Sequence, residues 1–278
     1  MNKIILLLLI CFITVFGFVV YVEMNSELEQ EIVEKEKVEE EDKTLVTEFV
    51  DEVEIANSYM DELKDPKLLK NTNFFKEMFA EKEKRLSNNE ELQRYVKGQT
   101  TIEGNHITIS ADKKNREYYS GIIESIVSFR YGTYRFKIKN IIGNGLFPAI
   151  WLVPNGLTSY PEVDIYEHIG NEPKTISGVM HNEINHKYYR EYFVHDFTGD
   201  VPSEYEVGLT WTKQRLAWYV NGEVVLEITE NVPDIPLIMI MNLAVGGIWP
   251  KNPTSDVEFP AYFDIEVLEF NPEEIIRR

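Results

Sequence analysis

Three carboxyl side chains lie within six residues, in the run Glu162-Val-Asp-Ile-Tyr-Glu167. Cleavage of a glycosidic bond with retained configuration needs two carboxyl groups about 5–5.5 Å apart on one side of a cleft. Residues i and i+2 of a strand share a face, so Glu162 and Asp164 lie together and Glu167 points away. One extra residue in a β-bulge, as occurs beside active sites, returns Glu167 to that face, with roughly 13 Å between the glutamate Cα atoms. The alternative is a polar strand face with carboxylates in solvent.

The neighbouring sequence favours the catalytic interpretation. The run resembles the signature of glycoside hydrolase family 16 in its bulged, laminarinase-like form, whereas the unbulged form has one residue fewer. Other segments between about residues 88 and 271 resemble the family in the same order: Asn89-Glu-Glu-Leu-Gln-Arg-Tyr95, Tyr119-Ser-Gly121, Arg130-Tyr-Gly-Thr-Tyr-Arg-Phe-Lys-Ile138, Gly145-Leu-Phe-Pro-Ala-Ile-Trp-Leu-Val-Pro154 and Asn242-Leu-Ala-Val-Gly-Gly-Ile-Trp-Pro250. Departures from the family pattern, which bear on the substrate rather than the reaction, occur at Ile122, Phe147, Tyr160 and Tyr166.

The resemblance implies a jelly-roll β-sandwich with a long concave cleft and a role for each carboxyl group. Glu162 would be the nucleophile and Glu167 the general acid/base. Asp164 would hold the nucleophile through a hydrogen bond. The two glutamates must differ in pKa, because one carboxylate attacks while the other donates a proton.

Aromatic and polar side chains are candidates for substrate binding. Trp151, Tyr160 and Trp249 can stack on the apolar faces of sugar rings, although Trp151 could equally be a core residue. The family pattern places His181 on the strand beside the catalytic one, facing the acid/base. Asn89 begins the early family-like segment and is a further candidate.

Two further tryptophans lie outside the family-like segments that indicate the cleft. Trp211 and Trp218 lie in alternating strands without a cleft motif, so we expect them to be structural.

Asp264 resembles a position that helps to bind a structural calcium in relatives, and calcium needs several oxygen ligands. The chemistry requires no cofactor. The remaining histidines have no spacing typical of a metal site.

The composition separates two parts of the chain. The 278 residues carry a formal charge of −19, and residues 23–65 alone contain 17 acidic and 4 basic residues. An acidic chain without a Lys/Arg cluster argues against nucleic acid or anionic lipid as a partner. The single cysteine, Cys11, excludes a disulfide framework.

The N-terminal region predicts a membrane attachment. Residues 4–22 are largely apolar and uncharged after Lys3, which favours an uncleaved signal anchor over a cleaved signal peptide. Residues 23–65 would form an acidic stalk that packs little against the rest, with a short coiled coil as the alternative. The domain at 66–278 would then face away from the cytoplasm, or be secreted if the segment is cleaved.

The C-terminal two-thirds has the pattern of an all-β protein. Residues 102–110 and 129–139 alternate, residues 215–226 form a hairpin around Asn221-Gly222, and residues 236–244 and 261–270 resemble buried strands. Many strands with short turns predict a sandwich of two antiparallel sheets. Together with the resemblance, this predicts a monomeric, endo-acting, retaining hydrolase of a β-linked polysaccharide, such as a β-1,3-containing glucan or related exopolysaccharide. A non-catalytic carbohydrate-binding sandwich and a transglycosylase remain the alternatives.

Overall fold

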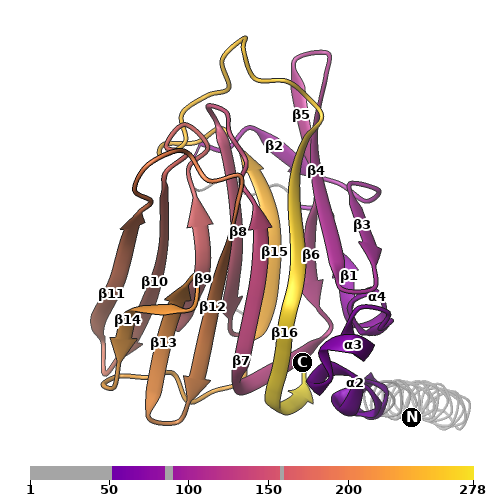
Figure 1. Cartoon of the computed structure of the whole chain (residues 1–278), viewed down its shortest axis with the longest axis vertical. Coiled ribbons are helices and arrows are strands. Elements are labelled where there is room, and N and C mark those ends of the chain that lie inside the picture. The colour runs from indigo at the N-terminus through magenta and orange to yellow at the C-terminus, as the bar shows by residue number, and fades with distance from the viewer. Residues whose placement is uncertain (1–51, 85–89, 157–159) are drawn as a thin grey trace, which may run out of the picture. The chain divides into compact units, whose positions relative to one another are not determined.

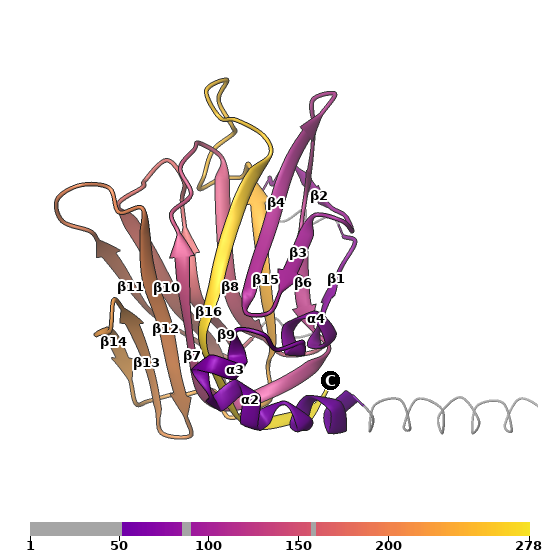
Figure 2. The ribbon, with the colours of Figure 1, turned by 45° about the vertical axis from the view of Figure 1, so that its right-hand side comes forward.

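Two β-sheets packed face to face form the body of the protein (Figure 1 and Figure 2). The computed structural model describes residues 52–84, 90–156 and 160–278, which belong to one compact unit that starts at Glu52. The first sheet has seven strands, in the order β1-β6-β15-β8-β9-β10-β11. Its strands are β1 (Phe79–Glu81), β6 (Ile122–Ser125), β8 (Leu146–Val153), β9 (Glu162–His168), β10 (Thr175–Ile184), β11 (Lys187–Asp196) and β15 (Ile238–Val245).

The second sheet has nine strands, in the order β14-β13-β12-β7-β16-β4-β5-β2, with β3 paired to β4. Its strands are β2 (Gln93–Tyr95), β3 (Thr100–Glu103), β4 (His106–Lys114), β5 (Glu117–Ser120), β7 (Val127–Lys139), β12 (Glu204–Thr212), β13 (Arg215–Val220), β14 (Glu223–Ile228) and β16 (Ala261–Arg277). The strand pairs within the sheets are antiparallel except β2 with β5. The predicted sandwich of two antiparallel sheets is therefore confirmed, with one local parallel pair.

Side-chain alternation explains how the two sheets enclose a core. Strand β4 alternates buried and more exposed residues along most of its length, whereas the central strand β15 is buried throughout. The predicted hairpin turn is present, because Asn221 and Gly222 both have positive φ, at 50° and 83°. That conformation matches the twist of the paired strands β13 and β14.

Short helical segments precede the sheets: residues 52–58, α2 (Met60–Lys64), α3 (Pro66–Leu69) and α4 (Phe74–Met78). Asp65 ends α2 and caps α3, accepting a hydrogen bond of 2.8 Å from the Lys67 backbone N–H. The helices contact β16, and Phe74 packs against Phe270 with ring centroids 5.4 Å apart.

The predicted boundary between stalk and domain is wrong. Ala56 and Leu63 are buried in the same core cluster as the strands, so residues 52–65 belong to the sandwich unit. The acidic side chains of Glu54 and Asp61 are exposed, whereas the apolar side chains of Ala56 and Leu63 are buried in the core. Composition alone therefore concealed an amphipathic segment.

The N-terminal predictions concern a part of the chain that is not described. The expected anchor at residues 4–22 and the expected stalk up to residue 51 both lie outside the described residues. Within residues 52–84, 90–156 and 160–278, no helix is long and apolar enough to cross a bilayer.

Candidate active site

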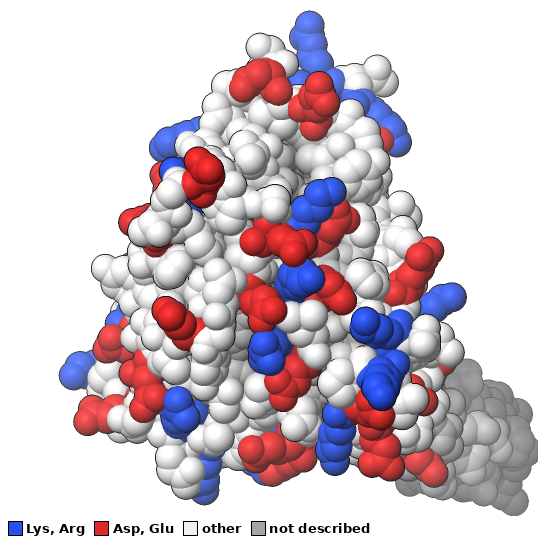
Figure 3. Space-filling model, in the orientation of Figure 1, with Lys and Arg blue, Asp and Glu red and all other residues white. Residues whose placement is uncertain are grey.

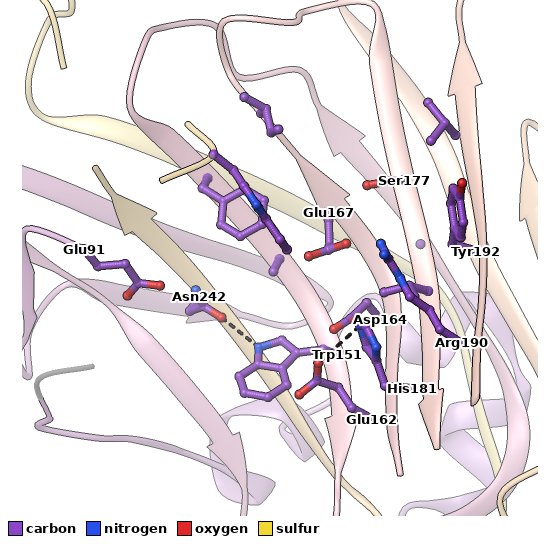
Figure 4. Close-up of a pocket in the computed structure, with 17 residues that line it drawn as sticks. Glu91, Trp151, Glu162, Asp164, Glu167, Ser177, His181, Arg190, Tyr192 and Asn242 are labelled. Atoms are coloured by element: carbon purple, nitrogen blue, oxygen red, sulfur yellow. Dashed lines mark hydrogen bonds and ion pairs between the residues drawn. The ribbon is translucent and has the colours of Figure 1, made fainter. Parts of the chain in front are cut away.

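The three carboxyl groups of β9 face one cleft of about 380 Å³ (Figure 4). On β10, Ser177 pairs with Glu167 and Val179 pairs with Asp164, so two β9 residues oppose Gly178 alone. The same shift occurs on the other side, against β8. The predicted bulge is thus confirmed, and it turns Glu167 to the side of Glu162 and Asp164.

The second sheet supports this bulge from behind. A bulge disrupts the local ladder of backbone hydrogen bonds. The buried indole of Trp218 on β13 donates a hydrogen bond of 3.0 Å to the backbone carbonyl of Asp164. Gly178 is needed opposite, because a Cβ there would lie 2.8 Å from that carbonyl oxygen and 2.6 Å from the Phe193 ring. Trp218 and Trp211 are both fully buried, as expected of structural residues.

Burial strongly perturbs the acidity of the trio. Desolvation raises the pKa of Glu162 to about 7. Desolvation and the charge of Glu162 raise the pKa of Glu167 to about 7, while Arg190 and the Ser177 hydroxyl act in the opposite direction. Burial, followed by the charges of the two glutamates, raises the pKa of Asp164 well above its usual range. Three such groups in one cleft cannot all be ionised at neutral pH, so at least one of them retains a proton.

His181 on β10 lies beside the carboxyl groups and is held from the edge strand. Its Nε2 lies 3.8 Å from Glu162 and 3.9 Å from Asp164. Its Nδ1 is 2.5 Å from the Tyr188 hydroxyl. Burial and Arg190 lower the pKa of His181, which favours the neutral ring. If the Tyr188 hydroxyl donates to Nδ1, the proton resides on Nε2 and faces the carboxylates.

The predicted aromatic contacts take different positions. Trp151 lines the cleft, and its indole donates a hydrogen bond of 2.8 Å to Asn242, which fixes the ring (Figure 4). Trp249 also lines the cleft and is 59% exposed, so its ring is open to a ligand. Tyr160 lies at the margin instead, 6.4 Å from the His181 ring between centroids. Asn89 lies outside the described residues.

The sequence interpretation missed several side chains that line the cleft: Glu91, Ser177, Arg190, Tyr192 and Asn242. Glu91 and Asn242 lie inside the quoted family-like segments, so the signal for them was present. Burial raises the pKa of Glu91, which accepts a hydrogen bond of 2.6 Å from Gln93. Arg190 and Tyr192 lie on β11, where tyrosines on both faces obscure the alternation.

The surroundings of Asp264 do not fit the expected calcium site. Thr108 donates a hydrogen bond of 2.8 Å to one oxygen of Asp264, and the Lys139 ammonium lies 3.7 Å from the other. A lysine at that distance opposes a cation that needs several oxygen ligands. Among the described residues, Glu162, Asp164 and His181 place possible ligand atoms within 4.8 Å of one another.

Comparisons with known proteins agree with this geometry. A family model described as glycosyl hydrolases family 16 matches residues 86–261. A β-glucanase of Rhodothermus marinus is 27% identical over 210 residues, covering 65% of this chain and 73% of that protein. Endo-1,3-1,4-beta-glycanase EglC of Rhizobium meliloti is 26% identical over 189 residues, covering 60% of this chain but only 40% of that protein. The chain thus spans less than half of this last relative.

Solved structures share the same fold. The X-ray structure of endo-beta-1,3-glucanase from Pyrococcus furiosus superposes with a TM-score of 0.58 at 27% identity, covering 68% of this chain and 86% of that one. The laminarinase catalytic domain from Thermotoga maritima gives a TM-score of 0.58 at 22% identity, covering 68% and 90%. Because the family match covers more than half of the sequence and includes all three carboxyl groups of β9, the chain belongs to glycoside hydrolase family 16.

Proposed function

We propose that the protein is an endo-acting, retaining glycoside hydrolase of β-linked polysaccharide. The observation that carries this proposal is the bulge of β9, which brings Glu162, Asp164 and Glu167 to one open cleft. A cleft open to solvent lets a long chain pass across the site, as endo-cleavage requires. The expected separation of about 5–5.5 Å between the two glutamate carboxyl groups stays a prediction.

The reaction proceeds by double displacement. Glu162 attacks the anomeric carbon while the bond to the leaving sugar breaks, and Glu167 transfers its proton to the leaving oxygen. Glu167 then removes a proton from water, the water oxygen attacks the anomeric carbon, and Glu162 is released. The raised pKa of Glu167, about 7, supports its role as the acid at neutral pH.

Asp164 resolves a conflict between the two glutamates. A nucleophile must be ionised, yet burial raises the pKa of Glu162 as well. Asp164 is the most deeply buried of the three, and the charges of both glutamates add to the effect of burial on its pKa. A proton held on Asp164 can be donated as a hydrogen bond to Glu162, which keeps Glu162 ionised.

The substrate backbone is proposed from the relatives. Their names include a β-glucanase, an endo-1,3-1,4-beta-glycanase and an endo-beta-1,3-glucanase. A β-1,3-containing glucan or a related exopolysaccharide is the corresponding proposal for this chain. A non-catalytic binding module would have no use for a buried trio of acids with raised pKa values, whereas transglycosylation uses the same residues and differs only in the acceptor.

Product stereochemistry tests the two glutamate roles. Glu167→Ala should still react with a substrate that has a good leaving group, and azide should then release a β-glycosyl azide with retained configuration. Glu162→Ala should give the α-azide, because azide attacks directly from the vacated face. NMR of the products distinguishes the two. If both variants yield the same anomer, or if Glu162→Ala keeps near-native activity on polymer, the assignment is wrong.

The location outside the cytoplasm is proposed on the N-terminal sequence alone. The apolar residues 4–22 after Lys3 support an anchored enzyme that faces its polysaccharide outside the cell. The measurement is the N-terminal sequence of the protein recovered from cells, together with its partition between membrane and medium. A start beyond residue 22 would replace the anchor by a cleaved signal peptide.

A further inference from the structure

The edge strand β11 contributes a wall to the cleft. Arg190 and Tyr192 are two positions apart on β11, so they share a face of the strand, and both line the cleft (Figure 4). Arg190 pairs with His181 on β10, and His181 pairs in turn with Glu162 on β9. Two strand spacings, roughly 10 Å, therefore separate the backbone of Arg190 from that of Glu162. Arg190 thus lies beside the carboxyl groups, where a sugar next to the scissile bond would lie.

Arg190 is the cationic side chain in the lining of the cleft. Among the described residues it forms no ion pair within 4.0 Å, although it is the one Lys or Arg in a lining that contains four carboxyl groups. Its guanidinium lies 4.8 Å from the centre of the Tyr192 ring. A guanidinium held against an aromatic face keeps its edge donors available to a ligand.

An effect on the catalytic acids does not explain this residue. Arg190 lowers the pKa of Glu167, which works against a general acid that must be protonated at neutral pH. Two arginines of the second sheet provide a contrast. Arg130 and Arg135, on the outer face of the second sheet, each reach a glutamate within 2.7 Å.

We propose that Arg190 binds an anionic substituent, a carboxylate or a sulfate ester, on a sugar next to the scissile bond. The preferred substrate is then an acidic β-linked polysaccharide rather than a neutral glucan. Both groups present two oxygens that a planar guanidinium can bind with two parallel hydrogen bonds. The formal charge of −19 provides no general attraction for a polyanion, so recognition depends on this local contact. The inference rests on the proposed hydrolysis in the same cleft.

Matched oligosaccharides test this inference. Neutral β-1,3-glucan oligosaccharides are compared with the same chains carrying either carboxylate or sulfate ester at C6. The measured quantity is the ratio of kcat/KM for the anionic substrate to that for the neutral one. We expect a ratio above one for the wild type in at least one arm, and that arm identifies the substituent. Loss of a charge-assisted hydrogen bond in Arg190→Gln should reduce the ratio about 10- to 100-fold.

Lys187→Gln is the matched control. Lys187 is exposed on the same strand, three positions from Arg190 and therefore on the opposite face, with its ammonium group over the Tyr189 ring. Its substitution removes the same charge as Arg190→Gln does. This variant should keep the wild-type ratio. A wild type that prefers neutral chains in both arms, or an Arg190→Gln variant whose ratio is unchanged, would overturn the proposal. An equal loss on both substrates leaves the ratio unchanged and also counts against it.

Binding to Glu162→Gln separates this inference from the hydrolase proposal. Calorimetry with the same oligosaccharides should show tighter binding of the anionic one, lost when Arg190→Gln is added. If no oligosaccharide is cleaved but the anionic one binds more tightly, the hydrolase proposal is wrong and the inference about Arg190 stands. If the oligosaccharides are cleaved without any preference for the anionic one, the inference about Arg190 fails and the hydrolase proposal stands. A result with no cleavage and no binding would overturn both proposals.

Discussion

Carboxyl groups on the outer face of the second sheet and those on β9 of the first sheet have different surroundings. On the outer face of the second sheet, Glu274 lies 2.6 Å from Arg130 and Glu206 lies 2.7 Å from Arg135. Figure 3 shows acidic and basic side chains intermingled over this face. On β9 of the first sheet, the three carboxyl groups line a cleft together with Arg190, but no lysine or arginine of the described residues forms an ion pair with them within 4.0 Å.

The difference shows how position alters the chemistry of one residue type. An exposed carboxylate beside a cation is stabilised as the anion and contributes little else. A desolvated carboxyl beside other carboxyls has a raised pKa and can hold or transfer a proton near neutral pH. Strand β9 thus carries an electrostatic cost that the outer face of the second sheet avoids, as is typical of functional sites.

Neutralising one glutamate in each sheet should give the largest contrast. Glu162→Gln removes the proposed nucleophile and should lower kcat on polymer by at least about 10⁴-fold. Glu274→Gln removes a partner of Arg130 at the surface and should change kcat less than about twofold. Reducing-end release at saturating substrate measures both. A Glu162→Gln enzyme within tenfold of wild type would remove the contrast.

The two buried tryptophans provide a finer comparison. Trp218→Phe leaves the Asp164 carbonyl without its donor, and Trp211→Phe does the same to the Pro233 carbonyl, bonded at 3.0 Å. Each should lower the free energy of unfolding by about 1–3 kcal/mol. Only Trp218→Phe should also lower kcat, by about tenfold or more, because Trp218 supports the bulge that carries the proposed catalytic carboxyl groups. Urea unfolding and kcat are the two measurements, and equal kcat values would assign Trp218 to stability alone.

The cost of burying Glu167 should appear in the pH dependence of stability. Its pKa is raised from an ordinary 4.5 to about 7 in the folded protein. Between these values the folded state binds the proton and the unfolded state has lost it, so the free energy of unfolding falls as the pH rises from 4.5 to 7. Glu167→Gln should therefore stabilise the protein at pH 8, by about 1–3 kcal/mol, and have little effect at pH 4. Melting temperatures at the two pH values test this. Glu206→Gln, in the second sheet, should not stabilise at pH 8.

The outer ion pairs should produce the smallest effect. A double-mutant cycle on Arg130 and Glu274 should give a coupling of about 0.2–1 kcal/mol, reduced by salt, because both side chains are partly exposed. Urea denaturation at low and high ionic strength provides the measurement. A coupling above about 3 kcal/mol would mean that this face is not the weakly coupled one.

Much of the site was accessible from the sequence, because local patterns encode it. Glu167 is an odd number of residues from Glu162 and Asp164, so the three side chains can share one face of a strand only if a bulge adds a residue, and the bulge is present. The residue types around β8 and β15 indicated the family. The sequence interpretation failed where distant strands converge. Arg190 and Tyr192 reach the cleft only because β11 pairs with β10. Residues 52–65 were assigned to a stalk because their acidic composition concealed the two buried positions Ala56 and Leu63.

The sequence by itself determined which groups could react, since the order of residues along β9 sets the side-chain alternation and the need for one extra residue. Only the tertiary structure decided how these groups behave. The Trp218 indole supports the bulge from 54 residues away, on the other sheet. Burial between the strands, rather than residue type, raises the pKa values of the trio, because desolvation depends on what surrounds a charge in space.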